Sequence, residues 1–147
     1  MEFAITASRG LMTPATLTVG AHMLQTVLLI SAGAVIGANL RYFVAQYVAK
    51  LIPSGFPWGT LTINISASFI LGFFLIWTSE RVLADPRWRA FVAVGFCATY
   101  STYSSYAYET FALFEKGHFS VAALNFLATN VICFIAVMLG AALARSL

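Results

Sequence analysis

The sequence predicts an all-α integral membrane protein with four transmembrane helices. Of its 147 residues, 61% are hydrophobic and only 9% are charged, whereas an ordinary soluble domain carries about 25% charged residues. Four apolar segments reach the ~20 residues that a helix needs to cross the hydrocarbon core of a bilayer, and short connections join them. The composition argues against a soluble enzyme, a disordered chain and a nucleic-acid-binding protein.

Residues 1–22 differ from the rest of the chain. They carry scattered Thr, Ser and Gly around Pro14, and no basic region precedes a solid apolar stretch, as a cleavable signal would require. We expect residues 1–22 to be an N-terminal extension, poorly ordered or added to the natural chain. The membrane domain is expected to occupy residues 23–147.

The expected spans follow one another along this domain. They lie at about residues 23–48, 59–78, 89–114 and 119–143. Short connections make neighbouring spans antiparallel, and an even number of spans places both ends of the domain on one side. Arginines in the middle connection and at the C-terminus favour that side as cytoplasmic, but their excess is small enough to permit insertion in both orientations.

Small residues in the first two spans have the spacing of close helix packing. Gly33 and Gly37 lie four residues apart in the first span, as do Ser68 and Gly72 in the second. Packing within one chain explains these pairs as well as a dimer seam does. Asn64 is the one amide of the second span, and its NH₂ group can donate to an anion or make an interhelical hydrogen bond.

The third span is unusually rich in hydroxyl groups. Ten of the twelve residues 99–110 carry one, and Glu109 lies among them. Because a buried hydroxyl needs a partner, we expect this helix to line a wet or ion-bearing interior; the alternative is that the hydroxyls bond to carbonyls of their own helix. A glycine ahead of the cluster predicts a break near Gly95–Ser101. Glu109 is interpreted as a functional intramembrane carboxylate, with a water-facing helix end as the alternative.

The fourth span carries one polar stripe. Asn125, Thr129 and Cys133 follow at intervals of four residues, and Asn130 is a further amide off that stripe. The interior therefore offers hydroxyls, amides and aromatic ring edges, with one acid and no deep basic residue. Such neutral donors suit a small, hard anion. Because four helices do not easily enclose a pathway, we expect a functional unit of two or more chains.

Three motifs together resemble the CrcB/Fluc family of fluoride channels. They are Gly37-Ala38-Asn39-Leu40-Arg41-Tyr42, Pro57-Trp58-Gly59-Thr60-Leu61-Thr62-Ile63-Asn64, and Gly95-Phe96-Cys97 with the hydroxyl-rich run to Glu109. The resemblance covers residues 23–147. It implies a passive fluoride-selective channel that exports cytoplasmic fluoride across the cell inner membrane. It also implies an antiparallel dual-topology homodimer with two pores and a central structural sodium ion.

The resemblance implies roles for individual residues by matching position. The backbone carbonyls of Ala98 and Ser101 would hold the sodium ion, and Arg41 would be structural or line a vestibule. The residues expected to line the fluoride pore are Asn64, Tyr103, Ser105, Tyr106, Glu109, Asn125, Thr129 and Cys133. The expected partners are fluoride, a second copy of the chain and the lipid bilayer, with no nucleic acid.

The chain departs from the family pattern at the proposed site. Tyr103 and Tyr106 replace the two pore phenylalanines, and Ala98 stands where glycine-rich sequence is usual. These departures motivate an alternative, a pore-altered or non-conducting relative. A small multidrug-type transporter also fits the length, but that class depends on a glutamate deep in the first span, which residues 23–40 lack. No nucleophile–base pair, metal ligand set or phosphate-binding loop predicts an enzyme.

Overall fold

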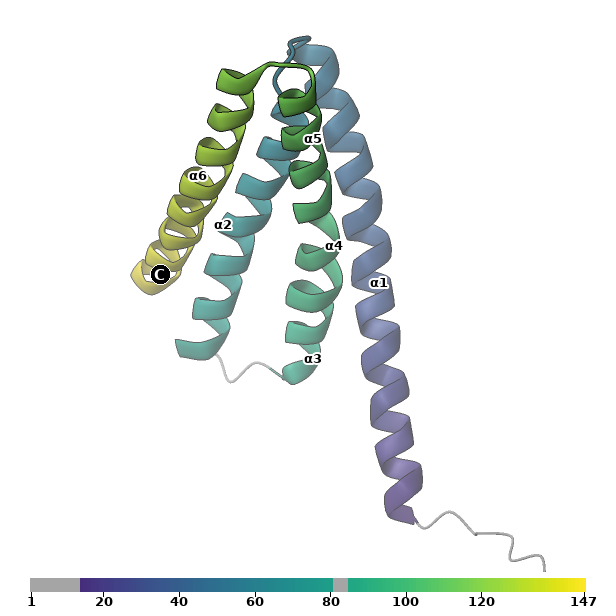
Figure 1. Cartoon of the computed structure of the whole chain (residues 1–147). Helices are drawn as coiled ribbons and strands as arrows, with labels where there is room; N and C mark the ends of the chain where they lie inside the picture. Colours follow the sequence, from purple (N-terminus) through teal and green to yellow (C-terminus); the bar gives the residue numbers. More distant parts are fainter. Residues whose placement is uncertain (1–13, 81–84) are drawn as a thin grey trace, which may run out of the picture.

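The computed structural model describes residues 14–80 and 85–147, without the side chains of residues 14–19, and these residues form helices and short connections (Figure 1). The elements are α1 (Pro14–Leu51), α2 (Trp58–Glu80), α3 (Pro86–Trp88), the π-helical η1 (Arg89–Cys97), α4 (Ala98–Tyr100), α5 (Tyr103–Glu115) and α6 (Phe119–Ser146). In the described part of the chain, α1, α2 and α6 are long and apolar enough to cross a membrane. Elements α3 to α5 form one interrupted rod.

The all-α architecture and the apolar helices of the first, second and fourth expected spans are confirmed. The first helix begins at Pro14 rather than Met23, so residues 14–22, expected outside the membrane domain, are helical. Proline suits the start of a helix because its fixed φ is helical and its missing N–H would have no partner there. Residues 1–13 lie outside the described residues, so the expectation for them stays a prediction.

Helix α2 is the central element of the fold. It packs along α6 on one side and contacts α1 and η1 on the other, while α1 lies against η1 and α4. The helices approach closely through glycine. A Cβ atom added to Gly72 would meet the Val137 carbonyl of α6, and one added to Gly140 would meet the Phe69 carbonyl of α2. These two glycines therefore allow the α2 and α6 backbones to touch.

The glycines of α1 serve the same purpose against the interrupted rod. A Cβ atom on Gly33 would meet the Phe91 carbonyl of η1, and one on Gly37 would meet Thr99 Oγ1 of α4. A Cβ atom on Gly95 would lie 2.6 Å from the Ile30 carbonyl. The small-residue motifs of the first two spans therefore pack within one chain. The sequence alone allowed this interpretation or packing between two chains.

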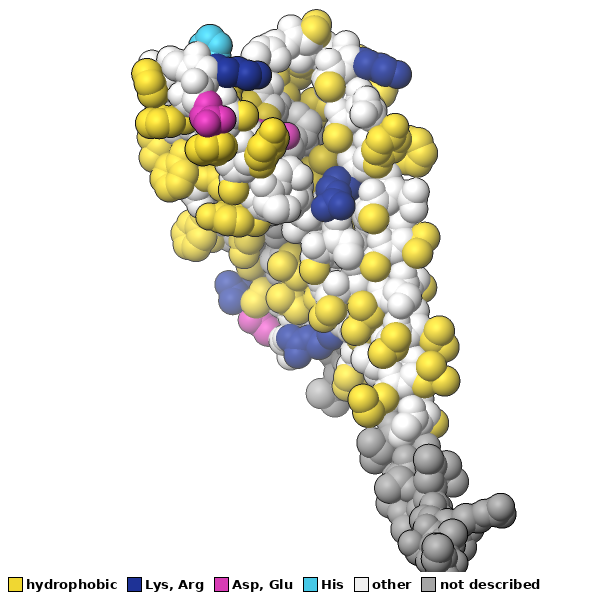
Figure 2. Space-filling model, turned by 45° about the vertical axis from the view of Figure 1, so that its right-hand side comes forward, with side chains coloured by type: hydrophobic (Ala, Val, Ile, Leu, Met, Phe, Trp, Pro, Cys, Tyr) yellow, Lys and Arg dark blue, Asp and Glu magenta, His cyan; other side chains and the backbone are white. Residues whose placement is uncertain are grey.

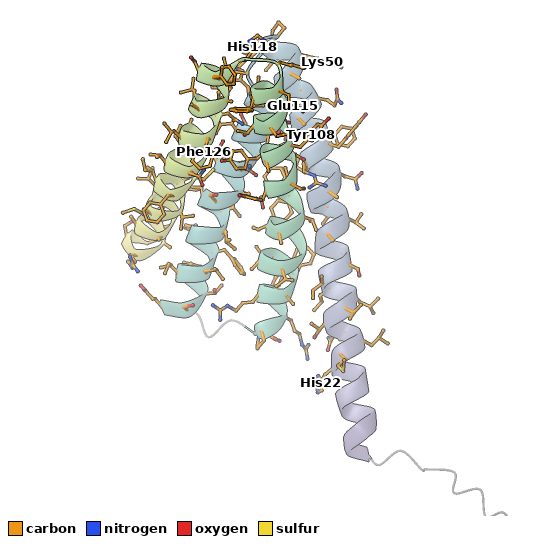
Figure 3. All side chains as sticks on the ribbon, viewed as in Figure 1. His22, Lys50, Tyr108, Glu115, His118 and Phe126 are labelled. Carbon is orange, nitrogen blue, oxygen red and sulfur yellow. The ribbon has the colours of Figure 1, made fainter. Side chains whose placement is uncertain are left out.

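Most large apolar side chains lie on the surface of the molecule. A small buried cluster joins Ile63, Ala67 and Tyr100. Figure 2 shows apolar side chains over most of the visible face, with most charges towards the ends of the helices. Figure 3 places Lys50 and His118 at the end of the bundle where α5 turns into α6. This distribution is typical of helices surrounded by lipid, which replaces water along the sides of the bundle.

Replacing Gly140 by valine tests the contact between α2 and α6. The new side chain meets the Phe69 carbonyl, and overpacking of this kind typically costs ~1–3 kcal/mol of folding free energy. We expect a lower midpoint of thermal unfolding in detergent. Gly20→Ala is the matched control, because no atom lies within 4 Å of its Cβ position. An unchanged midpoint for Gly140→Val would contradict the close approach of the two helices.

Candidate functional site

The hydroxyl-rich segment is interrupted between α4 and α5. The Ser101 N–H donates to the Cys97 carbonyl (3.0 Å), after which Ser101 and Thr102 adopt extended backbone, with ψ of 162° and 113°. The prediction of a break near Gly95–Ser101 is thus confirmed at the C-terminal end of that range. Gly95 itself is helical and buried against α1. The glycine permits close packing, and the unwinding occurs at the hydroxyl residues.

The side-chain amide of Asn64 in α2 makes hydrogen bonds to the backbone at this break. Its Nδ2 donates to the Thr102 carbonyl (3.1 Å), and its Oδ1 accepts from the Thr102 N–H (2.8 Å). Both residues are buried. A single amide therefore satisfies both backbone groups of a residue that has left the helix, as an interruption inside a membrane requires. Asn64 thus makes the interhelical hydrogen bond that was one of the two roles predicted for it. One Nδ2 hydrogen remains for another acceptor.

The same contacts release two backbone carbonyls. In a continuous helix, the carbonyls of Ala98 and Ser101 would accept from the N–H groups of Thr102 and Ser105. The Thr102 N–H instead donates to Asn64, and the Ser105 N–H donates to Thr102 Oγ1 (3.2 Å), which caps α5. Both carbonyls therefore lose their helical donors. Unwound backbone carbonyls of this kind are ligands that suit Na⁺ in membrane proteins.

A polar cleft of about 240 Å³ opens beside the break. Its lining consists of Asn64, Ser68, Ser101, Thr102, Tyr103, Tyr106, Thr129, Asn130 and Cys133. The structure thus brings together most of the side chains expected to line a pore, drawn from α2, α5 and α6. Three expected residues, Ser105, Glu109 and Asn125, are not part of this lining. Asn130 lines the cleft, although the spacing of polar residues in the fourth span places it off the polar stripe.

The two tyrosines at the cleft have different surroundings. Tyr106 is only 3% exposed, whereas Tyr103 is 76% exposed in the single chain. Their rings meet edge to face with centroids 5.4 Å apart. The Tyr106 hydroxyl accepts a hydrogen bond from Asn130 Nδ2 (2.8 Å). Tyr106 is therefore fixed within the chain, while Tyr103 presents most of its ring outward.

A second group of polar side chains lies further along α5. Thr60 Oγ1 donates to Glu109 Oε1 (2.8 Å), and Glu109 Oε2 is buried with no hydrogen-bond partner among the described residues. Asn125 Nδ2 donates to Thr110 Oγ1 (2.8 Å). Asn125 is 1% exposed. These contacts tie α5 to α2 and to α6 and hold the Glu109 carboxylate inside the bundle.

The sequence allowed two interpretations of the hydroxyl groups of the third span: they line a polar interior, or they bond to carbonyls of their own segment. The structure shows both. Thr99 and Thr110 donate to backbone carbonyls four residues earlier in the rod, at Gly95 (2.6 Å) and Tyr106 (2.8 Å). Thr102 instead caps α5, and its Oγ1 donates to Ser105 Oγ (3.0 Å). Some of these hydroxyls therefore bond to backbone carbonyls of the preceding turn, and others bond at the break or line the cleft.

Arg41 lies apart from the polar cleft. It is half-buried on α1 and makes no hydrogen bond or ion pair with another described residue. It follows Gly37, the residue at which α1 touches Thr99, by about one helical turn. The vestibule or structural role expected for Arg41 stays a prediction.

Comparison with known proteins supports the resemblance seen in the sequence. Residues 28–141 match the family described as CrcB-like protein, Camphor Resistance (CrcB). A fluoride-specific ion channel FluC of Koribacter versatilis is 48% identical over 124 residues, which cover 84% of this chain and 98% of that protein. Proteins of the same name from a Sulfurihydrogenibium species and from Rhodospirillum rubrum are 43% and 41% identical, over 84% and 79% of this chain and 100% and 92% of their own lengths.

Replacing Asn64 by leucine tests how the break is held. The substitution leaves the buried N–H and C=O of Thr102 without partners, and each such group costs about 1–3 kcal/mol. We expect a lower free energy of unfolding in detergent and faster hydrogen exchange in peptides spanning residues 101–104. Asn39→Leu is the matched control, because that exposed amide bonds only to Val35 of its own helix. Equal exchange in both variants would mean that the break does not depend on Asn64.

Proposed function

The chain belongs to the CrcB-like protein family, and on this premise we propose that it is a passive fluoride-selective channel of the cell inner membrane that exports cytoplasmic fluoride. The observation that supports this function best is the polar cleft beside the broken helix. Its lining supplies amide and hydroxyl donors and aromatic ring edges, and none of the described lining residues is basic. The relatives are named as channels, in agreement with the prediction that the chain is not an enzyme.

The proposed channel uses the interrupted rod as the third of its four spans. This rod, residues 86–115, lies beside α1 and α2 in Figure 1 and contacts both. With α1, α2 and α6 it gives a multi-pass protein with four spans. We assign the assembly as an antiparallel dual-topology homodimer with two pores. In support, Tyr103, Tyr108 and Phe111 of α5 are 76%, 70% and 54% exposed, and a second copy would cover them.

Fluoride is held in this proposal by neutral donors. Asn64 keeps one Nδ2 hydrogen beyond its bonds to Thr102, and Tyr103 offers a weakly positive ring edge. The further pore positions are Ser105, Tyr106, Glu109, Asn125, Thr129 and Cys133. Neutral donors bind a small anion without the strong attraction of a buried cation, and conduction requires that the ion also leave.

We also propose that the carbonyls of Ala98 and Ser101 from two copies hold a structural sodium ion. Both carbonyls lose their helical donors at the break. Ala98 has an ordinary right-handed backbone, with φ of −67°, so the alanine in place of glycine does not strain the chain. When bound, the ion would offset the partial negative charge of carbonyls that face no N–H group.

Fluoride efflux from proteoliposomes tests the proposed function directly. Vesicles loaded with fluoride are given a potassium ionophore, and a fluoride electrode records release; chloride-loaded vesicles are the control. We expect rapid fluoride release without chloride release, because fluoride accepts hydrogen bonds from the amide and hydroxyl donors of the cleft more strongly than chloride does. A folded protein that releases no fluoride would instead be a pore-altered or non-conducting relative.

Thermal unfolding in salts of different cations tests the sodium site. A ligand that binds only the folded protein raises its stability as its concentration rises. We expect the unfolding midpoint in detergent to rise with Na⁺ concentration but not with K⁺ or N-methylglucamine at equal ionic strength. Equal midpoints in all three salts would remove the sodium ion from the proposal and leave the fluoride test unaffected.

A further inference from the structure

Asn130 makes two hydrogen bonds that fix the orientation of its amide. Its Nδ2 donates to the Phe126 carbonyl (2.7 Å), four residues earlier on α6, and to the Tyr106 hydroxyl of α5 (2.8 Å). A backbone carbonyl can only accept, so the amide atom that faces Phe126 must be the nitrogen. The same nitrogen faces the phenol. Both hydrogens of the amide are thereby used, one on each oxygen.

This orientation decides the direction of the Tyr106 hydroxyl. Because the phenolic oxygen accepts from Asn130, its own hydrogen points away from Asn130 and needs a different acceptor. No described residue accepts this hydrogen, because the bond from Asn130 is the one hydrogen bond that the Tyr106 hydroxyl makes with the described residues. Tyr106 is 3% exposed. The acceptor for this donor must therefore be a ligand or a water molecule in the space beside it.

The space into which this donor can point is the polar cleft. Tyr106 and Asn130 both line it, together with Asn64 from α2. Asn64 also keeps one unused N–H after its bonds to Thr102. The edge-to-face contact with Tyr103, at 5.4 Å between centroids, holds the Tyr106 ring in place. The residues that carry these two neutral donors, Asn64 of α2 and Tyr106 of α5, therefore line the same cleft.

We infer that Asn130 is a positioning residue that holds the Tyr106 hydroxyl as a hydrogen-bond donor to fluoride in the cleft. The inference rests on the proposed function and names a specificity-determining pair within that site. Asn130 does not touch the anion and acts through the phenol. Fluoride is the strongest hydrogen-bond acceptor among the halides, so an added O–H donor favours it over chloride. Tyrosine in place of phenylalanine at position 106 thus gives this chain an added hydroxyl group that can bind the anion.

A double-mutant cycle on fluoride flux tests the pair. We expect Asn130→Leu and Tyr106→Phe each to weaken the apparent fluoride affinity of efflux by about two- to tenfold, as for the loss of one neutral hydrogen bond. The double variant should match Tyr106→Phe alone, because Asn130 acts only through the hydroxyl. Asn39→Leu is the control, since Asn39 makes the same bond to its own helix (2.7 Å to Val35) and contacts no phenol. Additive effects, or an unchanged affinity in Asn130→Leu, would overturn the inference.

A spectroscopic measurement separates this inference from the proposed function. Ultraviolet resonance Raman bands of tyrosine report whether a phenol donates or accepts hydrogen bonds, and subtraction of the Tyr106→Phe spectrum isolates Tyr106. We expect fluoride, but not chloride, to shift these bands towards a donating phenol in the detergent-solubilised protein, and Asn130→Leu to abolish the shift. No shift with fluoride, or an equal shift in Asn130→Leu, would refute the pair even if the wild type conducts. A shift in a protein that fails to conduct would support the pair and refute the channel.

Discussion

The structure depends on the pairing of the Asn64 side chain with the Thr102 backbone. A membrane-spanning segment cannot leave backbone groups unpaired, because lipid offers no hydrogen bonds. The hydroxyl-rich segment can be interrupted because one amide replaces both missing backbone partners, at 3.1 and 2.8 Å. The same pairing withdraws the Thr102 N–H from the Ala98 carbonyl and lets Thr102 cap the next helix. The break, the released carbonyls and the start of α5 are consequences of a single contact between α2 and the rod.

Glycine packing places that contact where the cleft can form. Gly33, Gly37 and Gly95 bring the backbones of α1 and η1 together, and this fixes the rod alongside the first helix. Gly72 and Gly140 do the same for α2 and α6. Gly59 of α2 lies close to α1, because an added Cβ atom would be 3.2 Å from the Ala45 carbonyl oxygen. Helix α2 is therefore held close to both α1 and α6, and side chains of ordinary length reach from one helix to the next. A wider spacing would leave Asn64 short of Thr102 and would separate the donors that line the cleft.

Much of the fold follows from the sequence, because apolar runs of sufficient length form helices in a membrane whatever their partners. The interruption was also predictable, since a dense set of hydroxyls competes with helical hydrogen bonding. Other features were not. The periodicity of α6 showed that Asn125, Thr129 and Cys133 share a face, but it carries no information about the element that this face meets. Asn125 bonds to Thr110, and Asn130, off the stripe, reaches Tyr106. The extension of α1 to Pro14 was missed because its first residues are polar enough to resemble a connection.

The pairing of Tyr106 with Asn130 bears on how a channel with tyrosines in place of phenylalanines would work. A ring edge alone attracts an anion weakly, whereas a hydroxyl donor attracts it more strongly. Donation from Asn130 to the phenolic oxygen also polarises the O–H bond, and linked hydrogen bonds of this kind strengthen one another. On the proposed function, the pair raises fluoride affinity at one point of the pathway. Tighter binding slows release at that point, so the arrangement favours selective binding of fluoride from a dilute cytoplasmic pool over the highest throughput. The amide beside the phenol therefore adjusts this balance without adding charge to the membrane interior.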